Sequence, residues 1–466
     1  MPLYLDNFHT VDFYRQHGFN LHQYQVTCIN YIKSRKRCGL FLDMGCGKTL
    51  VTLIALAEIQ PKGNVLVIAP KSVAKRSWFD EIDKWKIPVA YDTLMASKKD
   101  KRYDKYEEVL NTPAKLYTIN TDLIKDLVEY YKNKGVEFPF NTVVVDECHA
   151  FKSGQSKRFN ALKEVINKPE YVIMLTGTPA PAGYLDLWSQ IYLLDNGKRL
   201  GKYFSRYREE YFYPNKRINN IPCDWRMKPN AEDYINKQIS DIVVSVKNDV
   251  LRNQLPDLLV ETIKIPVSQA LKDKYQKFKS QKYMEIGGQD ITAQLAITLF
   301  TKLRQFVSGN VIDTESGQTL HIHDEKVDAL ERLRDQSNDN LLVAYWFKSD
   351  IAAITKRFPD AVVYDPNKPE IITKWNNGNI PMLLINPASA GLGLNLQQGG
   401  HTFIWYTLPT SLMHYEQANA RLYRQGQTNM VTIYHLCLDL DIEDKLLYAL
   451  QNKADVQNML MDYIKL

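Results

Sequence analysis

The sequence predicts an α/β protein with two open parallel sheets and helical insertions between them. Three observations lead to this fold class. Short apolar strands alternate with helix-length segments in two separate stretches, a glycine-rich turn joins a strand to a helix in the first stretch, and the chain between the stretches is aromatic and basic. Strands that are short and apolar throughout are typical of parallel sheets, because helices cover both of their faces.

The first stretch covers about residues 20–195. Runs rich in Val, Ile and Leu predict its strands at Gly39–Asp43, Asn64–Pro70, Leu116–Asn120, Thr142–Asp146 and Tyr171–Thr176. Helical patterns lie between them, for example at Lys48–Ile59 and Ser72–Trp85. Ligands of such sheets bind at the carboxyl ends of the strands, so motifs at those ends carry the functional prediction.

The second stretch covers about residues 320–466 and repeats the pattern. Its strands are predicted at Asn340–Tyr345, Ala361–Tyr364, Met382–Asn386, Thr402–Tyr406 and Val431–Leu436. Helices are expected at Lys326–Arg334 and Ile351–Arg357. The alternation again predicts an open parallel sheet.

The domain boundaries follow from these patterns. We expect a first lobe at residues 1–195, a helical projection of that lobe at 196–255, a linker and second helical projection at 256–320, and a second lobe at 321–466. Residues 268–310 are mostly helix formers, and the linker is placed near Leu255–Asp257.

Composition narrows the class of protein. The net charge of +6 permits a polyanionic partner without requiring one. The six cysteines form no C-x-x-C pair, which argues against a zinc module. The sequence shows neither a signal peptide nor an apolar run of the roughly 20 residues that cross a bilayer. We therefore expect a cytoplasmic protein with no membrane partner, in a reducing compartment.

The strongest motif is Phe41–Thr49, which follows an apolar strand and opens a helix. Glycines let backbone N–H groups turn toward phosphate oxygens, the lysine adds a positive charge, and the threonine hydroxyl can hold Mg²⁺. The predicted nucleotide-binding residues are Gly45, Cys46, Gly47, Lys48 and Thr49. The alternative is an ordinary strand–turn–helix with a chance G-K-T, since Leu42 stands where the full P-loop pattern has glycine.

A second motif, Val143–His149, is an apolar strand that ends in two acids. Asp146 is a candidate Mg²⁺ ligand, and Glu147 a candidate base for attack of water on the γ-phosphate. His149 is placed to sense this site from its edge. An acidic turn at the end of a strand is the alternative, but the P-loop about 100 residues earlier, in the same predicted sheet, argues against it.

A third motif, Glu416–Gln427, contains Arg421 and Arg424, which would share one face of a helix. Two guanidinium groups directed at a phosphate would stabilise the charge on a transferring phosphoryl group. A solvated basic helix is the alternative for an isolated R-x-x-R.

Together these motifs resemble superfamily-two helicases, specifically the Swi/Snf-type remodelling and repair translocases. In this resemblance Leu21–Gln25 corresponds to the Q motif, Ala69–Lys71 to motif Ia, and Leu175–Pro179 to motif III. Leu342–Phe347, Ser389–Leu396 and Gln417–Gln427 correspond to motifs IV, V and VI. The Q-A-x-x-R-x-x-R-x-G-Q form of motif VI is the most specific of them. Cys148 and the segment Ala180–Gly183 depart from the family pattern, and the latter concerns the coupling of ATP to DNA.

The resemblance implies two RecA-like lobes with ATP and Mg²⁺ in the cleft between them. The first lobe would supply Lys48, Thr49, Asp146 and Glu147. It also implies that Gln25 contacts adenine and that Gly393 and Gln417 contact the nucleotide. His149, Thr176 and Thr178 would couple the nucleotide to the lobes. Candidate contacts to the DNA backbone are Lys71, Thr121, Ser389 and Asn395.

The implied partner is double-stranded DNA, including forked or branched DNA, bound without sequence preference by a monomeric, minimal bacterial or phage-type motor. The alternatives are a nucleotide-gated DNA clamp that does not move, and a helicase that separates DNA or RNA strands. Unwinding helicases commonly carry a wedge hairpin between motifs V and VI, but only one strand-length run, Thr402–Tyr406, lies between Leu396 and Gln417. We therefore expect tracking on duplex DNA.

Overall fold

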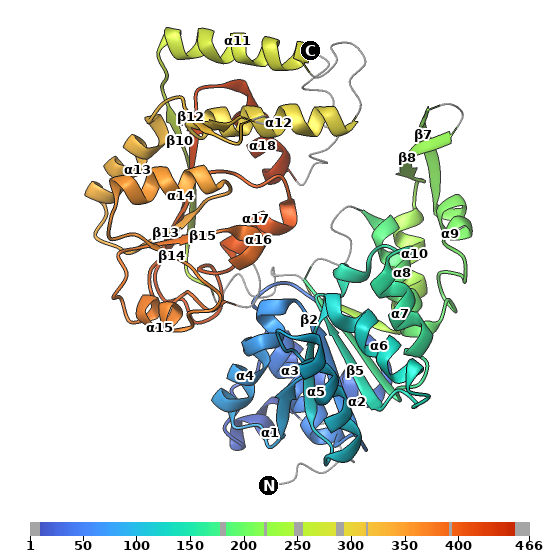
Figure 1. Cartoon of the computed structure of the whole chain (residues 1–466). Helices are drawn as coiled ribbons and strands as arrows, with labels where there is room; N and C mark the ends of the chain where they lie inside the picture. Colours follow the sequence, from blue (N-terminus) through green and yellow to red (C-terminus); the bar gives the residue numbers. More distant parts are fainter. Residues whose placement is uncertain are drawn as a thin grey trace. The chain divides into compact units, whose positions relative to one another are not determined.

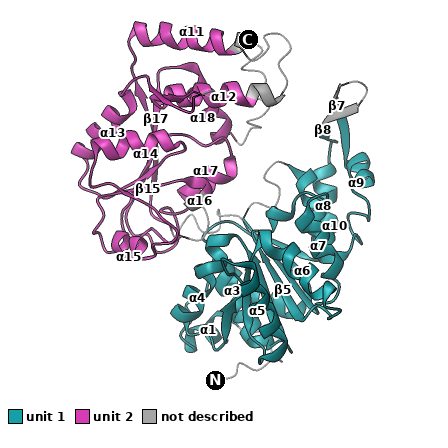
Figure 2. Ribbon diagram, viewed as in Figure 1, with its two compact units in different colours: residues 1–250 teal, residues 251–466 magenta. Residues whose placement is uncertain are grey.

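The computed structural model describes residues 10–177, 183–218, 221–246, 255–285, 293–313, 316–390 and 394–452. The chain divides into two compact units, residues 1–250 and 251–466 (Figure 2). Among the described residues, no helix combines the length and apolar character needed to span a membrane.

Unit 1 contains a seven-stranded sheet in the order β3-β4-β2-β5-β6-β1-β9, and every neighbouring pair is parallel. Its strands are β1 (Arg37–Leu42), β2 (Asn64–Ala69), β3 (Tyr91–Thr93), β4 (Leu116–Asn120), β5 (Phe140–Asp146), β6 (Tyr171–Thr176) and β9 (Val243–Val246). The five predicted strands of this unit are confirmed, and the short β3 and β9 extend the sheet at its two edges.

The helices of unit 1 lie around its sheet and beside the hairpin described below (Figure 1). They are α1 (Val11–Gln16), α2 (Gln23–Ser34), α3 (Lys48–Ile59), α4 (Trp78–Trp85), α5 (Lys99–Asn111), α6 (Ile124–Asn133), α7 (Lys157–Val165), α8 (Leu187–Asp195), α9 (Phe204–Tyr211) and α10 (Ala231–Ile239). Short turns of other helix types are the π-helical η1 (Val73–Ser77) and the 3₁₀ turns η2 (Thr121–Leu123), η3 (Cys148–Phe151) and η4 (Tyr184–Asp186).

The prediction that residues 196–255 form a helical projection is wrong in part. An antiparallel hairpin of β7 (Phe212–Ile218) and β8 (Ile221–Met227) lies between α9 and α10 and projects from the rest of unit 1 (Figure 1). Its base is held against α9, where the Arg208 guanidinium lies 4.2 Å from the ring centroid of Trp225. The basic and aromatic residues that led to the prediction of helices thus stack on one another at the base of the hairpin.

Unit 2 contains a six-stranded parallel sheet in the order β10-β17-β16-β13-β15-β14. Its strands are β10 (Leu258–Ile265), β13 (Leu341–Ala344), β14 (Val362–Val363), β15 (Met382–Ile385), β16 (Thr402–Trp405) and β17 (Val431–Leu438). The five predicted strands are confirmed. The sixth, β10, belongs to this sheet although it lies in the segment expected to be a linker.

Helices of unit 2 are α11 (Gln269–Glu285), α12 (Ala293–Val307), α13 (Glu325–Gln336), α14 (Lys348–Arg357), α15 (Glu370–Asn376), α16 (Pro387–Ala390), α17 (Leu412–Asn419) and α18 (Asp441–Gln451). A small hairpin pairs β11 (Asn310–Ile312) with β12 (Thr319–His321). The helical character expected for residues 268–310 is thus present in α11 and α12.

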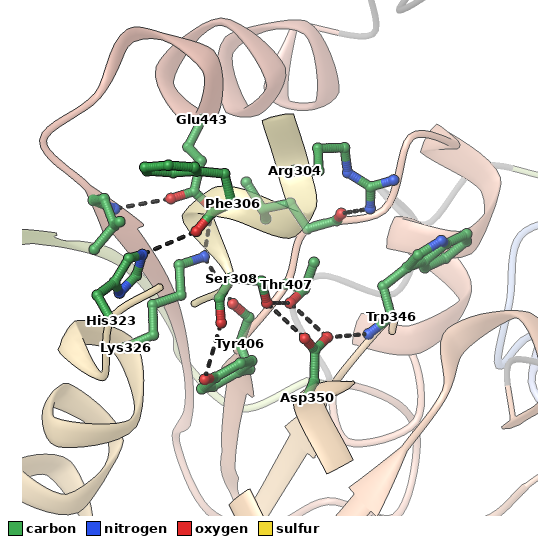
Figure 3. Close-up of polar contacts among 12 residues, drawn as sticks. Arg304, Phe306, Ser308, His323, Lys326, Trp346, Asp350, Tyr406, Thr407 and Glu443 are labelled. Carbon is green, nitrogen blue, oxygen red and sulfur yellow. Dashed lines mark hydrogen bonds and ion pairs between the residues drawn. The ribbon is translucent and has the colours of Figure 1, made fainter. Parts of the chain in front are cut away.

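A buried polar cluster ties several of these elements together (Figure 3). The Asp350 carboxylate, at the start of α14, accepts hydrogen bonds from the hydroxyls of Ser308 (2.7 Å) and Thr407 (2.9 Å) and from the backbone N–H of Phe347 (2.9 Å). The buried Arg304 guanidinium, on α12, donates to the carbonyl of Leu408. The cluster thereby connects α12 and α14 to the segment that follows β16.

Candidate functional site

The turn between β1 and α3 has the backbone conformation that a phosphate-binding loop requires. Gly45 and Gly47 have φ angles of +81° and +75°, which side-chain-bearing L residues rarely adopt. A Cβ atom at Gly47 would lie 2.5 Å from Nε2 of Gln25, so a side chain there would also have to displace the Gln25 amide. Helix α3 begins at Lys48, directly after this turn, and its first N–H groups are therefore available to an anion.

Helix α2 holds the loop from the other side. The Gln25 amide donates to the carbonyl of Cys46 at 3.3 Å and accepts from the backbone N–H of His22 at 2.9 Å. The Tyr24 hydroxyl donates to the same Cys46 carbonyl at 3.2 Å. Burial raises the pKa of the Cys46 thiol to about 11, so this side chain is a neutral packing group. Gln25 is thus at the nucleotide loop, and its contact with adenine stays a prediction.

The Lys48 ammonium lies over the carboxyl end of β1. It donates to the carbonyl oxygens of Leu42 at 2.8 Å and Asp43 at 3.4 Å. The chain that follows β6 borders the same space, since a Cβ atom at Gly177 would lie 3.5 Å from Lys48 Nζ and 3.2 Å from Met44 Cγ. Thr49 occupies the first turn of α3 beside Lys48. The predicted lysine and hydroxyl are therefore placed together at the carboxyl edge of the sheet.

Asp146 is the last residue of β5 and is almost fully buried, at 6% exposure. Both carboxylate oxygens accept a hydrogen bond: Oδ2 from the indole N–H of Trp78 and Oδ1 from the backbone N–H of Glu147, each at 3.0 Å. Burial and then the neighbouring charge of Glu147 raise the pKa of Asp146, whereas the Trp78 bond and the charge of Lys48 lower it. A bound cation would relieve the cost of keeping this carboxylate charged.

Glu147 and His149 follow Asp146 in a tight turn. Glu147 has a φ of +51°, which is unusual for a residue with a side chain and turns the chain sharply after β5. Its Oε2 lies 3.1 Å from Nδ1 of His149, and that nitrogen lies 3.4 Å from Oγ1 of Thr176 at the end of β6. His149, a predicted coupling residue, thus contacts both the predicted base Glu147 and the predicted coupling residue Thr176, while the third coupling residue, Thr178, lies outside the described residues.

The second set of predicted residues lies in unit 2. Helix α17 ends at Asn419, so the prediction that Arg421 and Arg424 share one face of a helix is wrong; both lie in the turns that follow it. They nevertheless converge, because Nη1 of each donates to the carbonyl of Leu394, at 3.1 and 3.3 Å. Nε of Arg421 also donates to the carbonyl of Gln417 at 2.8 Å. The turn therefore achieves the convergence that was expected from a helix.

The predicted backbone contacts to DNA have different environments. Lys71 and Asn395 are exposed, and the Asn395 carbonyl accepts a hydrogen bond from Asn376. Thr121 is only 4% exposed, and its hydroxyl has no hydrogen-bond partner among the described residues. Ser389 lies in α16, but its side chain, like the whole of Gly393, falls outside what the structure describes.

Trp78 is the residue at this site that sequence reasoning missed. It lies in helix α4, 68 positions from Asp146 in strand β5, and no spacing rule connects the two. The only available signal was a tryptophan in the helix that follows β2, which is a common core residue.

The residues of unit 1 fit a magnesium-bound nucleoside triphosphate. A glycine turn at a helix N-terminus suits phosphate, and Lys48, Thr49 and a single buried carboxylate supply the charge and oxygen ligands. Within the described chain, no group of three or more His, Cys, Asp or Glu side chains could hold a metal alone.

Comparison with known proteins identifies the relatives of this chain. The family model described as SNF2-related domain matches residues 22–309. The phage protein p41 of Acyrthosiphon pisum secondary endosymbiont phage 1 is 31% identical over 96% of this chain and 99% of its own length. An uncharacterized ATP-dependent helicase of Mycoplasma genitalium is 25% identical over 96% of this chain, which spans 42% of that protein. Among solved structures, the Sulfolobus solfataricus SWI2/SNF2 ATPase core in complex with dsDNA has a TM-score of 0.44 and 22% identity, with 95% of each chain covered.

Proposed function

Because the chain belongs to the SNF2-related family, we propose that it is an ATP-hydrolysing motor that tracks along double-stranded DNA without reading its sequence. The observation that carries this proposal is that the charge of Lys48, at the start of α3, acts on the buried carboxylate of Asp146 at the end of β5, where Glu147 is the next residue. A protein that only bound nucleotide would need the lysine and the metal ligand but not a second acid placed as a base.

In the proposed mechanism, the N–H groups at the start of α3 and the Lys48 ammonium bind the β- and γ-phosphates. Thr49 and Asp146 would hold Mg²⁺, which would neutralise charge on the phosphates. Glu147 accepts the proton of the attacking water, and His149, 3.1 Å from the Glu147 carboxylate, holds that carboxylate in place. Thr176 touches the same histidine. Movement of the chain after β6 would thereby reach the proposed base.

Arg421 and Arg424 are proposed to stabilise the charge that develops on a transferring phosphoryl group. Both guanidinium groups are held by the Leu394 carbonyl. A guanidinium carries its N–H donors in a planar fork that matches the geometry of phosphate oxygens. Gln417, whose carbonyl binds Arg421, positions the first of them.

DNA is proposed to be held mainly by its phosphates, with Lys71, Ser389 and Asn395 as contacts from positions in motifs Ia and V. Phosphate contacts give affinity without sequence preference and make binding weaken as salt rises. Thr121 was predicted to join them, and its burial means that a contact there would require local movement of η2.

The structure contains one element that favours a second candidate function, strand separation. Between Leu394 and Gln417 the described chain has β16 as its one strand, so no wedge hairpin lies there. The β7–β8 hairpin, however, projects from unit 1 (Figure 1) and carries the exposed side chain of Tyr213. An exposed aromatic side chain on a projecting hairpin could stack on an unpaired base.

One set of assays distinguishes these functions. ATPase activity is measured in parallel with double-stranded DNA, single-stranded DNA, forked DNA and RNA, with the Glu147→Gln variant as the inactive control. We expect double-stranded DNA to stimulate hydrolysis most. Displacement of a triplex-forming strand is then compared with unwinding of a tailed duplex under the same conditions.

Triplex displacement without unwinding would support duplex tracking. Efficient unwinding with no triplex displacement would overturn it in favour of strand separation. ATP binding with no hydrolysis on any nucleic acid would leave a nucleotide-gated clamp.

A further inference from the structure

Trp78 and Asp146 are joined by a hydrogen bond whose function no sequence motif predicts. Resting on the proposed function, we propose that Trp78 is a positioning residue, whose indole N–H fixes the orientation of the metal-binding carboxylate of Asp146. The bond from Nε1 to Oδ2 is 3.0 Å long, and Trp78 has no exposed surface. The second oxygen, Oδ1, is fixed by the N–H of Glu147, also at 3.0 Å. The two donors together set the plane of the carboxylate.

Two fixed hydrogen bonds leave the carboxylate free to bind a cation. Each carboxylate oxygen can accept about two hydrogen bonds or ligand contacts, so one position on each oxygen remains. Mg²⁺ demands near-octahedral geometry, which a freely rotating carboxylate would meet only part of the time. Partners that orient metal ligands typically affect metal affinity by about 10–100-fold when they are removed.

The chain reaches this arrangement through an irregular helix. After β2 the helix runs through the π-helical turn Val73–Ser77 before α4 begins at Trp78. The Ala74 carbonyl within this turn accepts a hydrogen bond from the Thr118 hydroxyl of β4 at 2.6 Å, which anchors the turn to the sheet. A π-helical turn widens the helix and shifts the direction of the residues that follow. Such turns are frequent at functional sites.

The other tryptophan of α4, Trp85, satisfies its indole N–H with a local hydrogen bond. The indole N–H of Trp85 donates to Glu81 at 2.8 Å, four residues earlier in the same helix. That bond is local and half-buried, and it touches no residue of the candidate site. A buried indole needs only one acceptor, and a neutral carbonyl would suffice. Trp78 instead donates to the one buried carboxylate at the end of β5.

The test compares Trp78→Phe with Trp85→Phe as the matched control. Binding of Mn²⁺, as a spectroscopic substitute for Mg²⁺, is measured by electron paramagnetic resonance on protein saturated with a non-hydrolysable ATP analogue. We expect Trp78→Phe to weaken Mn²⁺ binding by about tenfold or more and Trp85→Phe to leave it unchanged. Hydrolysis by Trp78→Phe should recover as Mg²⁺ is raised, because the missing orientation lowers metal occupancy. A general loss of structure would not be reversed by metal.

Phenylalanine also leaves a cavity, so a second replacement isolates the hydrogen bond. Incorporation of 3-benzothienylalanine at position 78 keeps the shape of indole and removes only its N–H donor. Weakened Mn²⁺ binding in this variant supports the inference, and wild-type Mn²⁺ affinity in it overturns the inference while leaving the proposed function intact. A wild-type protein that binds neither the ATP analogue nor Mn²⁺ would overturn the proposed function and this inference together.

Discussion

Lys326 and Glu443 form an ion pair inside unit 2, with side-chain exposures of 0% and 4% (Figure 3). The lysine ammonium also donates to the Tyr406 carbonyl at 2.9 Å, and the carboxylate accepts from the N–H of Leu438 at 2.9 Å. The pair therefore joins α13 and α18 to the ends of β16 and β17. Charges removed from water in this way are tolerated only while both partners are present.

Removing one partner of this pair should destabilise the protein strongly. We expect Lys326→Met to lower the free energy of unfolding by about 3–5 kcal/mol, because it leaves a buried carboxylate without its cation. The double variant Lys326→Met/Glu443→Leu should recover most of this loss. Urea unfolding of both variants measures the difference, and a single variant within about 1 kcal/mol of wild type would contradict the burial of the pair.

The buried histidine of β17 predicts a dependence of stability on pH. His435 has no exposed surface, its Nε2 lies 2.9 Å from the Tyr415 hydroxyl, and burial lowers its pKa to about 4. In the unfolded chain the pKa returns to about 6.5. Between these values the unfolded state binds a proton that the folded state does not, so stability falls as the pH falls from about 6.5 to 4.

We therefore expect His435→Gln to depend less on pH than the wild type does. The difference in slope should approach 1.4 kcal/mol per pH unit in the middle of this window, which is the contribution of one proton. Free energies of unfolding measured from pH 7 to pH 4.5 give both slopes. Parallel curves for the two proteins would show that His435 is not held neutral by burial.

Lys48→Ala should abolish ATP hydrolysis and leave DNA binding largely intact. The lysine is placed to contact phosphates of the nucleotide, and the proposed DNA contacts are other residues. Phosphate release and DNA binding by fluorescence anisotropy are measured on the same preparation, with the exposed Lys62→Ala as the control. Wild-type turnover in Lys48→Ala would remove the P-loop assignment.

Glu147→Gln tests the proposed base. The substitution keeps the shape of the side chain and its hydrogen bonding but removes its ability to accept a proton. ATP should still bind, while hydrolysis should fall by at least about tenfold, equivalent to about 1.4 kcal/mol in the barrier. Single-turnover hydrolysis with prebound ATP measures this step, and a smaller effect would mean that another group activates the water.

Arg421→Ala and Arg424→Ala should each lower kcat much more than they weaken ATP binding. Interactions made only in the transition state affect kcat, whereas uniform binding affects KM. Arg357→Ala, which breaks exposed ion pairs with Asp328 and Glu331 in the same unit, is the matched control. Normal kcat in both test variants would identify the turn after α17 as a structural element alone.

The parts of the fold that the sequence predicted are those with simple local signals. Strands such as β5 and β15 are continuous apolar runs, because both faces of a parallel sheet are covered. β10 was missed because it is an edge strand whose first residues, Leu258 to Val260, are more than 40% exposed and whose sequence contains Glu261 and Lys264. Its pairing with β17 comes from far along the chain.

The candidate site shows the same division. The P-loop and the acids at the end of β5 were predictable because each is a short motif that adopts one characteristic backbone conformation. The end of α17 at Asn419 was not, since no glycine or proline follows until Gly426, and the turn is held instead by the contacts of Arg421 and Arg424 with Leu394. The role of Trp78 depends on a contact between distant segments, which no local pattern encodes.

The π-helical turn Val73–Ser77 has a consequence for how this segment tolerates changes in length. A single residue added to or removed from an α-helix rotates everything after it by about 100°. The wide turn holds about one residue more than a regular helical turn, so the same residues wound as regular α-helix would swing Trp78 away from β5. A one-residue deletion within Val73–Ser77 that restored a regular helix should therefore be accepted, because Trp78 would keep its direction, whereas a one-residue insertion should not. The direction of Trp78 thus depends on the number of residues after β2 and on the type of helical turn together.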